Sequence, residues 1–184
     1  MHARFGIITA GMLLVAATGC APMNYGSVRQ QVQLITDQND VIAAANRLFI
    51  CTDNRDWECV KDVFTPEVLF DMTSLSGGQP SKLTPQQIVD GWDQSLKKLK
   101  AIHHQAGNYQ ATIKENEADL FCYGIAFHYL PNPSNRNTRT FVGSYNFHLI
   151  RTPTGWKIDQ FKFNMKYIDG NKDLGSIKRK SKMM

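Results

Sequence analysis

Residues 118–130 read ADLFCYGIAFHYL, and this stretch decides the fold class of the chain. Successive side chains of a strand point to opposite faces, so the stretch separates into two rows. One row holds mainly small side chains and ends in His128, whereas the other holds bulky apolar and aromatic side chains. We expect the small row to leave space for a ligand cavity, and the bulky row to pack on the convex side or in a homo-oligomer interface.

Three similar segments flank this stretch, at residues 102–113, 139–151 and 155–167. Each is rich in Phe, Tyr, Ile and Thr, and residues that favour turns separate each from the next. Connections this short join neighbouring strands as hairpins, which predicts an antiparallel sheet.

Helical patterns come before the strands. Apolar residues recur at helical spacing over residues 37–51, and Asp56 is placed to cap a short second helix that Pro66 ends. Residues 68–72 are typical of a short strand. Thr84 begins a third helix, with proline at the first position and glutamine at the capping-box position. Helices followed by strands indicate an α+β fold, in which a curved antiparallel sheet wraps around about three N-terminal helices as a cone with an internal cavity.

The first residues are typical of an export signal. Arg4 precedes an apolar run from Gly6 to Ala17, which is too short to span a bilayer core. The run ends in Thr18-Gly19-Cys20, which resembles the cleavage motif of bacterial lipoproteins. That resemblance implies removal of residues 1–19 and acylation of Cys20, which would anchor the protein in a membrane. The alternative is an ordinary signal peptide with cleavage nearby.

The chain therefore divides into four predicted segments. Residues 1–19 are the signal, residues 20–35 a polar tether, residues 36–170 the folded domain and residues 171–184 a basic tail. Ala21 follows Cys20 in place of the Asp that is typical of inner-membrane retention. We therefore expect the anchor to lie in the outer membrane, with the domain facing the periplasm.

The net charge of +5 does not belong to the predicted domain. Setting aside Arg4 and the four basic residues of the tail leaves 16 of the 21 basic residues, which balance the 16 acidic ones. A nucleic-acid-binding domain carries its positive charge on a folded face, so we expect no nucleic-acid partner. The tail is expected either to touch anionic lipid or to be a solvated end. Its basic residues are Lys178, Arg179, Lys180 and Lys182.

Three cysteines remain besides Cys20. Cys51 and Cys59 lie eight residues apart across the predicted helix-turn-helix, and an exported protein permits a disulfide between them. The alternative is two unpaired thiols. Cys122 lies within a strand and is expected to be a small buried hydrophobic residue. Nothing in the spacing of cysteines and histidines indicates zinc, so we expect no metal.

The order of these elements resembles the SnoaL-like branch of the nuclear transport factor 2 superfamily over residues 36–167. The segment Asp53-Asn54-Arg55-Asp56-Trp57 resembles the acidic turn after the first helix of that family. The Gly143-x-Tyr145 strand and Gly155-Trp156-Lys157-Ile158 are similar to its closing hairpin. The resemblance implies a cone-shaped domain that binds small molecules.

Within the superfamily the chain is most similar to the scytalone dehydratases. That resemblance assigns catalytic roles to Asp53, His104 and His128, and substrate contacts to Ser144 and Asn146. Two positions depart from the pattern. Thr52 and Met72 stand where the dehydratases have the tyrosines that hold a catalytic water.

The chemistry that the resemblance implies is proton transfer on a small hydrophobic or cyclic molecule, without a cofactor. Asp53 would hydrogen-bond to His128 and orient it, and His128 or His104 would move the proton. Ser144 and Asn146 would bind the substrate oxygen. This is the activity of a lyase or an isomerase.

The alternative function is a non-catalytic lipoprotein that binds a ligand or another envelope component. The missing tyrosines and the envelope location favour it, and fold alone does not decide function. In either case we expect Phe70 and Trp92 to line the pocket together with the strand faces.

Overall fold

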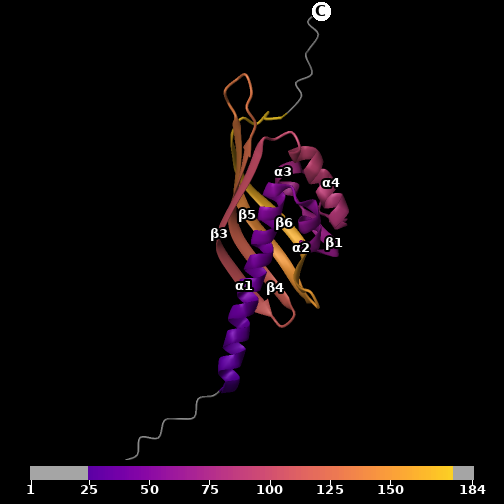
Figure 1. Ribbon diagram of the computed structural model, residues 1–184, viewed down its shortest axis with the longest axis vertical. Helices are drawn as coiled ribbons and strands as arrows, with labels where there is room; N and C mark the ends of the chain where they lie inside the picture. Colours follow the sequence, from indigo (N-terminus) through magenta and orange to yellow (C-terminus); the bar gives the residue numbers. More distant parts are fainter. Residues whose placement is uncertain (1–24, 176–184) are drawn as a thin grey trace, which may run out of the picture.

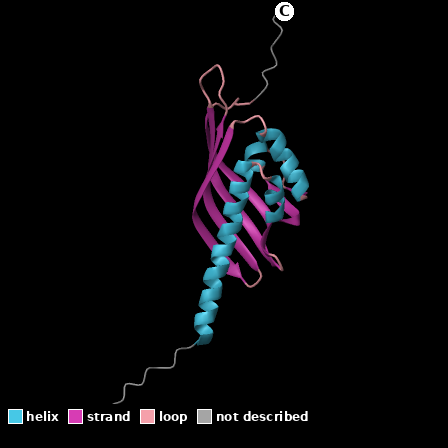
Figure 2. Ribbon diagram, viewed as in Figure 1, coloured by secondary structure: helices cyan, strands magenta, loops and turns pink. Residues whose placement is uncertain are grey.

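The computed structural model describes residues 25–175, which form one sheet with helices against its concave face (Figures 1 and 2). The sheet has six strands in the order β2-β1-β6-β5-β4-β3. The predicted signal, Cys20 and the basic residues of the tail lie outside the described residues. In chain order the elements are α1 (Tyr25–Asn54), α2 (Trp57–Val63), β1 (Phe64–Asp71), the one-turn α3 (Thr73–Ser76), β2 (Ser81–Leu83), α4 (Pro85–Leu96), β3 (Ala101–Lys114), β4 (Glu117–Tyr129), β5 (Thr138–Thr152) and β6 (Gly155–Gly170).

The predicted fold class, an α+β cone with a curved sheet, is confirmed. The four long strands β3 to β6 pair in sequence order as antiparallel hairpins. One pair departs from the antiparallel prediction, because β1 runs parallel to β6 and Phe70 lies opposite Phe161. Strand β1 precedes the long strands in the chain and reaches β6 by a long connection, which hairpin spacing does not reveal.

The small row of β4 faces the helices, as its composition predicts. Cys122 is fully buried in this row and His128 ends it, while Tyr123 in the other row is 45% exposed. The buried aromatic residues of β5 face the helices too, and they are Phe141, Tyr145 and Phe147. The core therefore lies between the aromatic side chains of β5, the small side chains of β4 and the apolar face of α1.

Helix α1 is longer than predicted, and it replaces most of the expected tether. It begins at Tyr25 rather than near residue 37, and residues 26–36 are all exposed. The helix extends past the edge of the sheet before Asp37 becomes its first buried residue (Figure 1). Without burial there is no apolar periodicity, so the pattern could not mark this part as helical. Among residues 25–175, none of the helices is long and apolar enough to cross a membrane.

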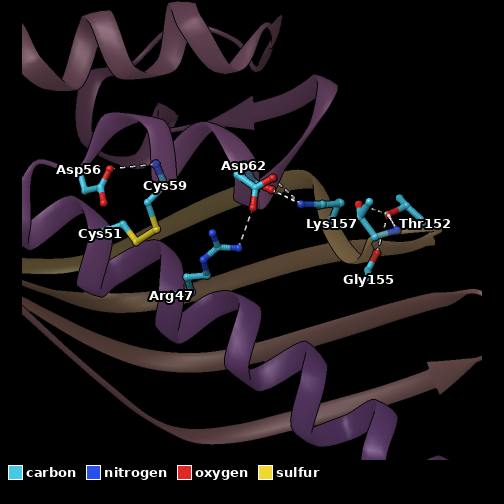
Figure 3. A network of polar contacts seen from close by, with 9 residues as sticks. Arg47, Cys51, Asp56, Cys59, Asp62, Thr152, Gly155 and Lys157 are labelled. Carbon is cyan, nitrogen blue, oxygen red and sulfur yellow. Dashed lines mark hydrogen bonds and ion pairs between the residues drawn. A yellow bond between two sulfur atoms is a disulfide. The ribbon is translucent and has the colours of Figure 1, made fainter.

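Covalent and ionic contacts hold α2 against its neighbours (Figure 3). A disulfide joins Cys51 of α1 to Cys59 of α2. The carboxylate of Asp62 forms ion pairs with Arg47 of α1 at 2.7 Å and with Lys157 of β6 at 3.0 Å. These contacts fix the end of α1, which is the segment that carries Asp53.

The third predicted helix begins as its sequence indicates. Thr84 caps α4 and exchanges hydrogen bonds with Gln87 in a capping box, with Pro85 at the first helical position. At the far end of this helix Leu96 joins a small buried cluster with Leu174. Leu174 is 3% exposed, so the chain stays packed on the domain at this residue, four residues beyond the predicted domain end at 170.

Candidate active site

A cavity of about 190 Å³ lies between the end of α1, α4 and the concave face of the sheet. Its lining is mostly aromatic and aliphatic, with two histidines and one arginine as the groups that carry or exchange protons. The volume is slightly larger than that of an apolar cavity known to hold benzene, so a ligand of about one ring fits it. The lining residues are Leu48, Phe49, Thr52, Met72, Leu75, Trp92, Ser95, Leu96, His104, Ala126, His128, Arg139, Phe141, Tyr145, Phe161 and Phe163.

The carboxylate of Asp53 binds His104 through both of its oxygens. Oδ1 lies 2.6 Å from Nδ1 of the imidazole, and Oδ2 accepts the backbone N–H of His104 at 2.8 Å. The two side chains are only 14% and 17% exposed. Strand β3 is the edge of the sheet, so this N–H has no strand to pair with and is free for a carboxylate. The double contact fixes the position of the ring relative to the helix.

The turn after α1 sets the place of Asp53. Arg55 adopts a positive φ of 53°, which reverses the chain so that the Asp56 N–H bonds to the carbonyl of Cys51. Asp56 then caps α2 by accepting the Cys59 N–H. The Arg55 guanidinium donates to the carbonyls of Leu96 and Leu99, which ties the turn to the end of α4. The segment DNRDW thus positions one catalytic candidate and joins three helices.

The contacts of His104 decide its tautomer. A carboxylate accepts hydrogen bonds, so Nδ1 carries the proton and Nε2 is left as an acceptor. Phe49 stacks on the imidazole with ring centroids 5.4 Å apart and an interplanar angle of 20°. Since His104 lines the cavity, its Nε2 is available as a base toward a ligand.

His128 has the opposite arrangement. Its Nδ1 lies 3.2 Å from Nη2 of Arg139. A guanidinium only donates, so Nδ1 accepts and Nε2 carries the proton. Burial, the neighbouring Arg139 charge and His104 together lower the pKa of His128 to about 3, against a smaller opposing effect of Asp53. His128 is therefore neutral at physiological pH and offers an N–H donor.

The two histidines lie diagonally on adjacent strands. Ala126 is the partner of His104, and His128 is two residues further along β4. Diagonal neighbours of this kind are about 7 Å apart. The cavity thus holds a proton acceptor on His104 and a neutral donor on His128, close enough to contact the same small molecule.

The predicted hydrogen bond between Asp53 and His128 is wrong. Asp53 lies at the end of α1 beside the edge strand β3, so it reaches His104, and Arg139 on β5 takes the place beside His128. The spacing of residues along the chain did not show which histidine the end of the helix would meet. His103, the neighbour of His104 in the chain, does not line the cavity, and its side chain is 69% exposed.

Ser144 and Asn146 do not contact the cavity. They alternate with the aromatic residues of β5 and point to the other face of the sheet, where Asn146 accepts a hydrogen bond from Asn164 at 2.8 Å. The predicted substrate role for this pair is therefore wrong. An alternating strand defines two faces, and the small polar face was assigned to the cavity when the aromatic face lines it.

The two predicted pocket aromatics behave differently. Trp92 of α4 lines the cavity. Phe70 does not line the cavity; it packs against two residues that do, stacked on Phe161 with centroids 5.0 Å apart and next to Trp92. Phe70 thus supports the lining and does not belong to it.

Sequence reasoning missed three important residues of the lining. Phe49 stacks on His104, Tyr145 lies across β4, and Arg139 contacts His128. Arg139 is the first residue of the strand predicted at residues 139–151. Its spacing from Phe141 and Tyr145, two and six residues further on, was a signal that it shares their face.

The two departures from the dehydratase pattern both lie on the cavity wall. Thr52 directs its hydroxyl to the Leu48 carbonyl at 2.8 Å, and Met72 offers only a thioether. Neither supplies the phenol that the pattern has at that place. Within residues 25–175, no group of three or more His, Cys, Asp or Glu side chains is arranged to hold a metal ion.

The family described as the SnoaL-like domain matches residues 33–162. No curated protein matches the chain.

Several solved structures share the fold. The Kfla4162 protein from Kribbella flavida superposes with a TM-score of 0.71 at 22% identity, over 74% of this chain and 95% of that one. A putative scytalone dehydratase from Novosphingobium aromaticivorans gives 0.65 at 12% identity, over 77% and 91%. The hexachlorocyclohexane dehydrochlorinase LinA-type3 from Novosphingobium barchaimii gives 0.64 at 11% identity, over 80% and 96%. Identities this low relate the folds alone.

Proposed function

Since the chain belongs to the SnoaL-like domain family, we propose that it is a cofactor-free lyase or isomerase in which Asp53 and His104 form the general base. The observation that carries the proposal is the 2.6 Å contact between Asp53 Oδ1 and His104 Nδ1. It leaves Nε2 of a cavity-lining imidazole as a proton acceptor, held by a carboxylate in the way that activates histidine bases.

The proposed reaction begins with a small apolar or cyclic substrate that carries a carbonyl group. Nε2 of His104 takes a proton from the carbon beside the carbonyl, and Asp53 stabilises the imidazolium that forms. The electron pair of the broken C–H bond moves into an enolate, whose oxygen accepts the Nε2–H of neutral His128. In an isomerase the proton returns to another carbon.

In a dehydratase the enolate expels a hydroxyl group instead. The electron pair forms a C=C bond, the C–O bond breaks, and the departing hydroxide takes the proton from His104 to leave as water. No oxidant, reductant or metal enters this balance. The N–H of neutral His128 stabilises the negative charge that develops on the substrate oxygen.

The test uses 3-hydroxycyclohexanone, a single-ring β-hydroxy ketone of suitable size. Proton NMR in D₂O follows both deuterium entry beside the carbonyl and formation of cyclohex-2-enone. We expect the protein to accelerate at least the deuterium entry, and His104→Gln to lower that rate by about 100-fold or more. His148→Gln is the matched control, because His148 also pairs with an aspartate, Asp159, but does not line the cavity. Equal rates for His104→Gln and the unaltered protein would overturn the proposal.

A second candidate is a non-catalytic ligand-binding domain, and Met72 is the observation that favours it. The dehydratase pattern has two tyrosines that hold a water at the positions of Met72 and Thr52. Here Met72 has only a thioether, and the Thr52 hydroxyl donates to the Leu48 carbonyl. This candidate expects tight retention of a one-ring ligand with no acceleration of deuterium entry. Native mass spectrometry of the purified protein reports the retained mass.

We further propose that the domain is anchored in the outer membrane through acylated Cys20 and faces the periplasm. The lipoprotein-like Thr18-Gly19-Cys20 supports this. Metabolic labelling with a palmitate analogue should mark the unaltered protein and not Cys20→Ser. Equal labelling of the two would exclude the anchor, and fractionation with the inner membrane would exclude the proposed location.

A further inference from the structure

We infer that Arg139 binds an anionic group of the ligand, so that the cavity takes small organic acids with an apolar body. This inference rests on the proposed function for the role of His104, and it names the class of substrate that the same site accepts. A carboxylate is the anion that matches a guanidinium best in geometry.

The first support is the set of contacts that Arg139 makes. Nη2 bonds to His128 at 3.2 Å, Nη1 reaches the Lys172 carbonyl at 3.5 Å, and Nε is buried with no partner among the described residues. Both partners are neutral groups. Within residues 25–175, Arg139 has no ion pair with a carboxylate. Burial lowers the pKa of Arg139, which indicates that the charge is poorly compensated.

The second support is the place of Arg139 in the cavity. Within the described part of the chain, Arg55 is also partly buried without an ion pair, but its guanidinium donates to the carbonyls of Leu96 and Leu99, and Arg55 does not line the cavity. Arg151 stacks on Trp156 and pairs with Asp37 at 2.7 Å. Arg139 also stacks on an aromatic ring, with its guanidinium 5.0 Å from the centroid of Phe141, but it has no carboxylate partner among the described residues. A half-buried guanidinium that lacks a counter-ion is costly, and a bound anion would remove that cost.

The third support is the position of Arg139 relative to the proposed base. Arg139 lies directly opposite His128 in the pairing of β5 with β4, and His104 lies on the next strand. The backbones that carry the cation and the base are thus two strand spacings apart, about 10 Å. A ligand held at Arg139 by its anionic end would extend an apolar ring past His128 and bring its far end toward His104.

The charges around the site agree with this orientation. Among residues 25–175, Asp53 is the one carboxylate that forms an ion pair with His104 or His128, and both of its oxygens contact His104. It sits at the far end of the proposed ligand, away from the anion. His128 stays neutral beside Arg139, so the positive end of the cavity is Arg139 alone among the described residues that line it.

The experiment compares benzoate with benzamide, which share ring and shape and differ in charge. Isothermal titration of the folded protein should show benzoate binding more tightly. Arg139→Met should weaken benzoate by about 10- to 100-fold and leave benzamide nearly unchanged. The matched control is Arg136→Met, because Arg136 is exposed and its guanidinium donates to the Gly170 carbonyl near the strand end. It should bind both probes as the unaltered protein does.

Two further measurements keep the inference open to refutation. If Arg139→Met fails to fold, the Nε–H resonance of Arg139 in the unaltered protein should shift on titration with benzoate and not with benzamide. His104→Gln should retain the preference for benzoate, which separates this inference from the base role of His104. Equal binding of the two probes to the unaltered protein, or an unmoved Nε–H signal, would overturn the inference even if deuterium entry is observed.

Discussion

The carboxylate of Asp53 controls which nitrogen of His104 is the base. It accepts from Nδ1 and from the backbone N–H, so a change of its side chain acts on the tautomer as well as on the charge. This residue-scale property can be tested separately from activity.

Asp53→Asn should convert His104 to the wrong tautomer. The amide can donate to Nδ1, and the proton then moves to Nε2, which stops acting as an acceptor. We expect deuterium entry into 3-hydroxycyclohexanone to fall by about 100- to 10,000-fold with little loss of folding. Long-range ¹⁵N NMR of the imidazole reports the tautomer directly. An Nδ1–H tautomer that persists in the variant would contradict this account.

His128 should make the protein lose stability in mild acid. Its folded pKa, about 3, lies below the ordinary value of 6.5, so below pH 6.5 the unfolded chain binds a proton that the folded one does not. Stability should therefore decline as the pH falls from about 6.5 toward 3. The groups that face His128 are Arg139, His104 and Asp53.

Urea unfolding at pH 7.5 and 4.5 measures this effect. We expect the unaltered protein to lose roughly 1 to 3 kcal/mol between these values, and His128→Gln to lose clearly less. The exposed His103→Gln should follow the unaltered protein. Asp37 and Asp71 do not interfere in this window, because hydrogen bonds from Arg151 and Thr73 hold their pKa values below 3.8.

At the scale of elements, the cavity depends on a close approach between β4 and β5. Gly124 lies opposite Gly143, and the ring of Tyr145 lies over the place that a side chain at 124 would occupy. A Cβ there would stand 2.8 Å from Cδ2 of that ring. Glycine at 124 therefore allows Tyr145 to lie flat across β4 and to pack against Phe49.

Gly124→Ala should destabilise the domain and alter the cavity wall together. Tyr145 is buried between Phe49 and Phe163, so its ring cannot move without strain, and we expect a loss of about 1 to 3 kcal/mol in the free energy of unfolding. Gly91→Ala is the matched control. Gly91 is exposed within α4 with nothing near its Cβ direction, so this change should stabilise by about 0.5 to 1 kcal/mol. Equal effects of the two changes would refute the packing argument.

The link between α1 and α2 predicts a specific thiol count. Cys51 and Cys59 are joined, and burial raises the pKa of the Cys122 thiol to about 12. In the Cys20→Ser protein, a thiol reagent should find no reactive group in the native state and one after unfolding without reductant. Three thiols after unfolding would show that the bridge is absent.

Over the whole molecule, the elements were more predictable than their mutual positions. Alternation identified β3 to β6, and the capping box identified the start of α4, because these signals depend on local geometry alone. The pairing of β1 with β6 brings together residues that are far apart in the chain, and no local pattern carries that information.

The site followed the same division. Asp53, His104 and His128 lie at the cavity or beside it, and their catalytic roles stay a prediction. Which histidine bonds to Asp53 depends on where the end of α1 lies against the edge strand β3. The face of β5 was misassigned because two alternating rows look equally plausible until the curvature of the sheet selects the concave one.

The first part of helix α1 is exposed to solvent and the second part is buried in the core. The free energy needed to unfold the helix locally therefore differs between the two parts. Residues 26–36 are exposed, while Val41 and Ala45 are fully buried. A helical stretch of this length is only marginally stable in water by itself, so it should open without the rest of the protein. Amide hydrogen exchange should be fast up to about Asp37 and then slow abruptly to the rate set by global unfolding. Uniform protection along α1 would mean that another surface covers its exposed turns in solution.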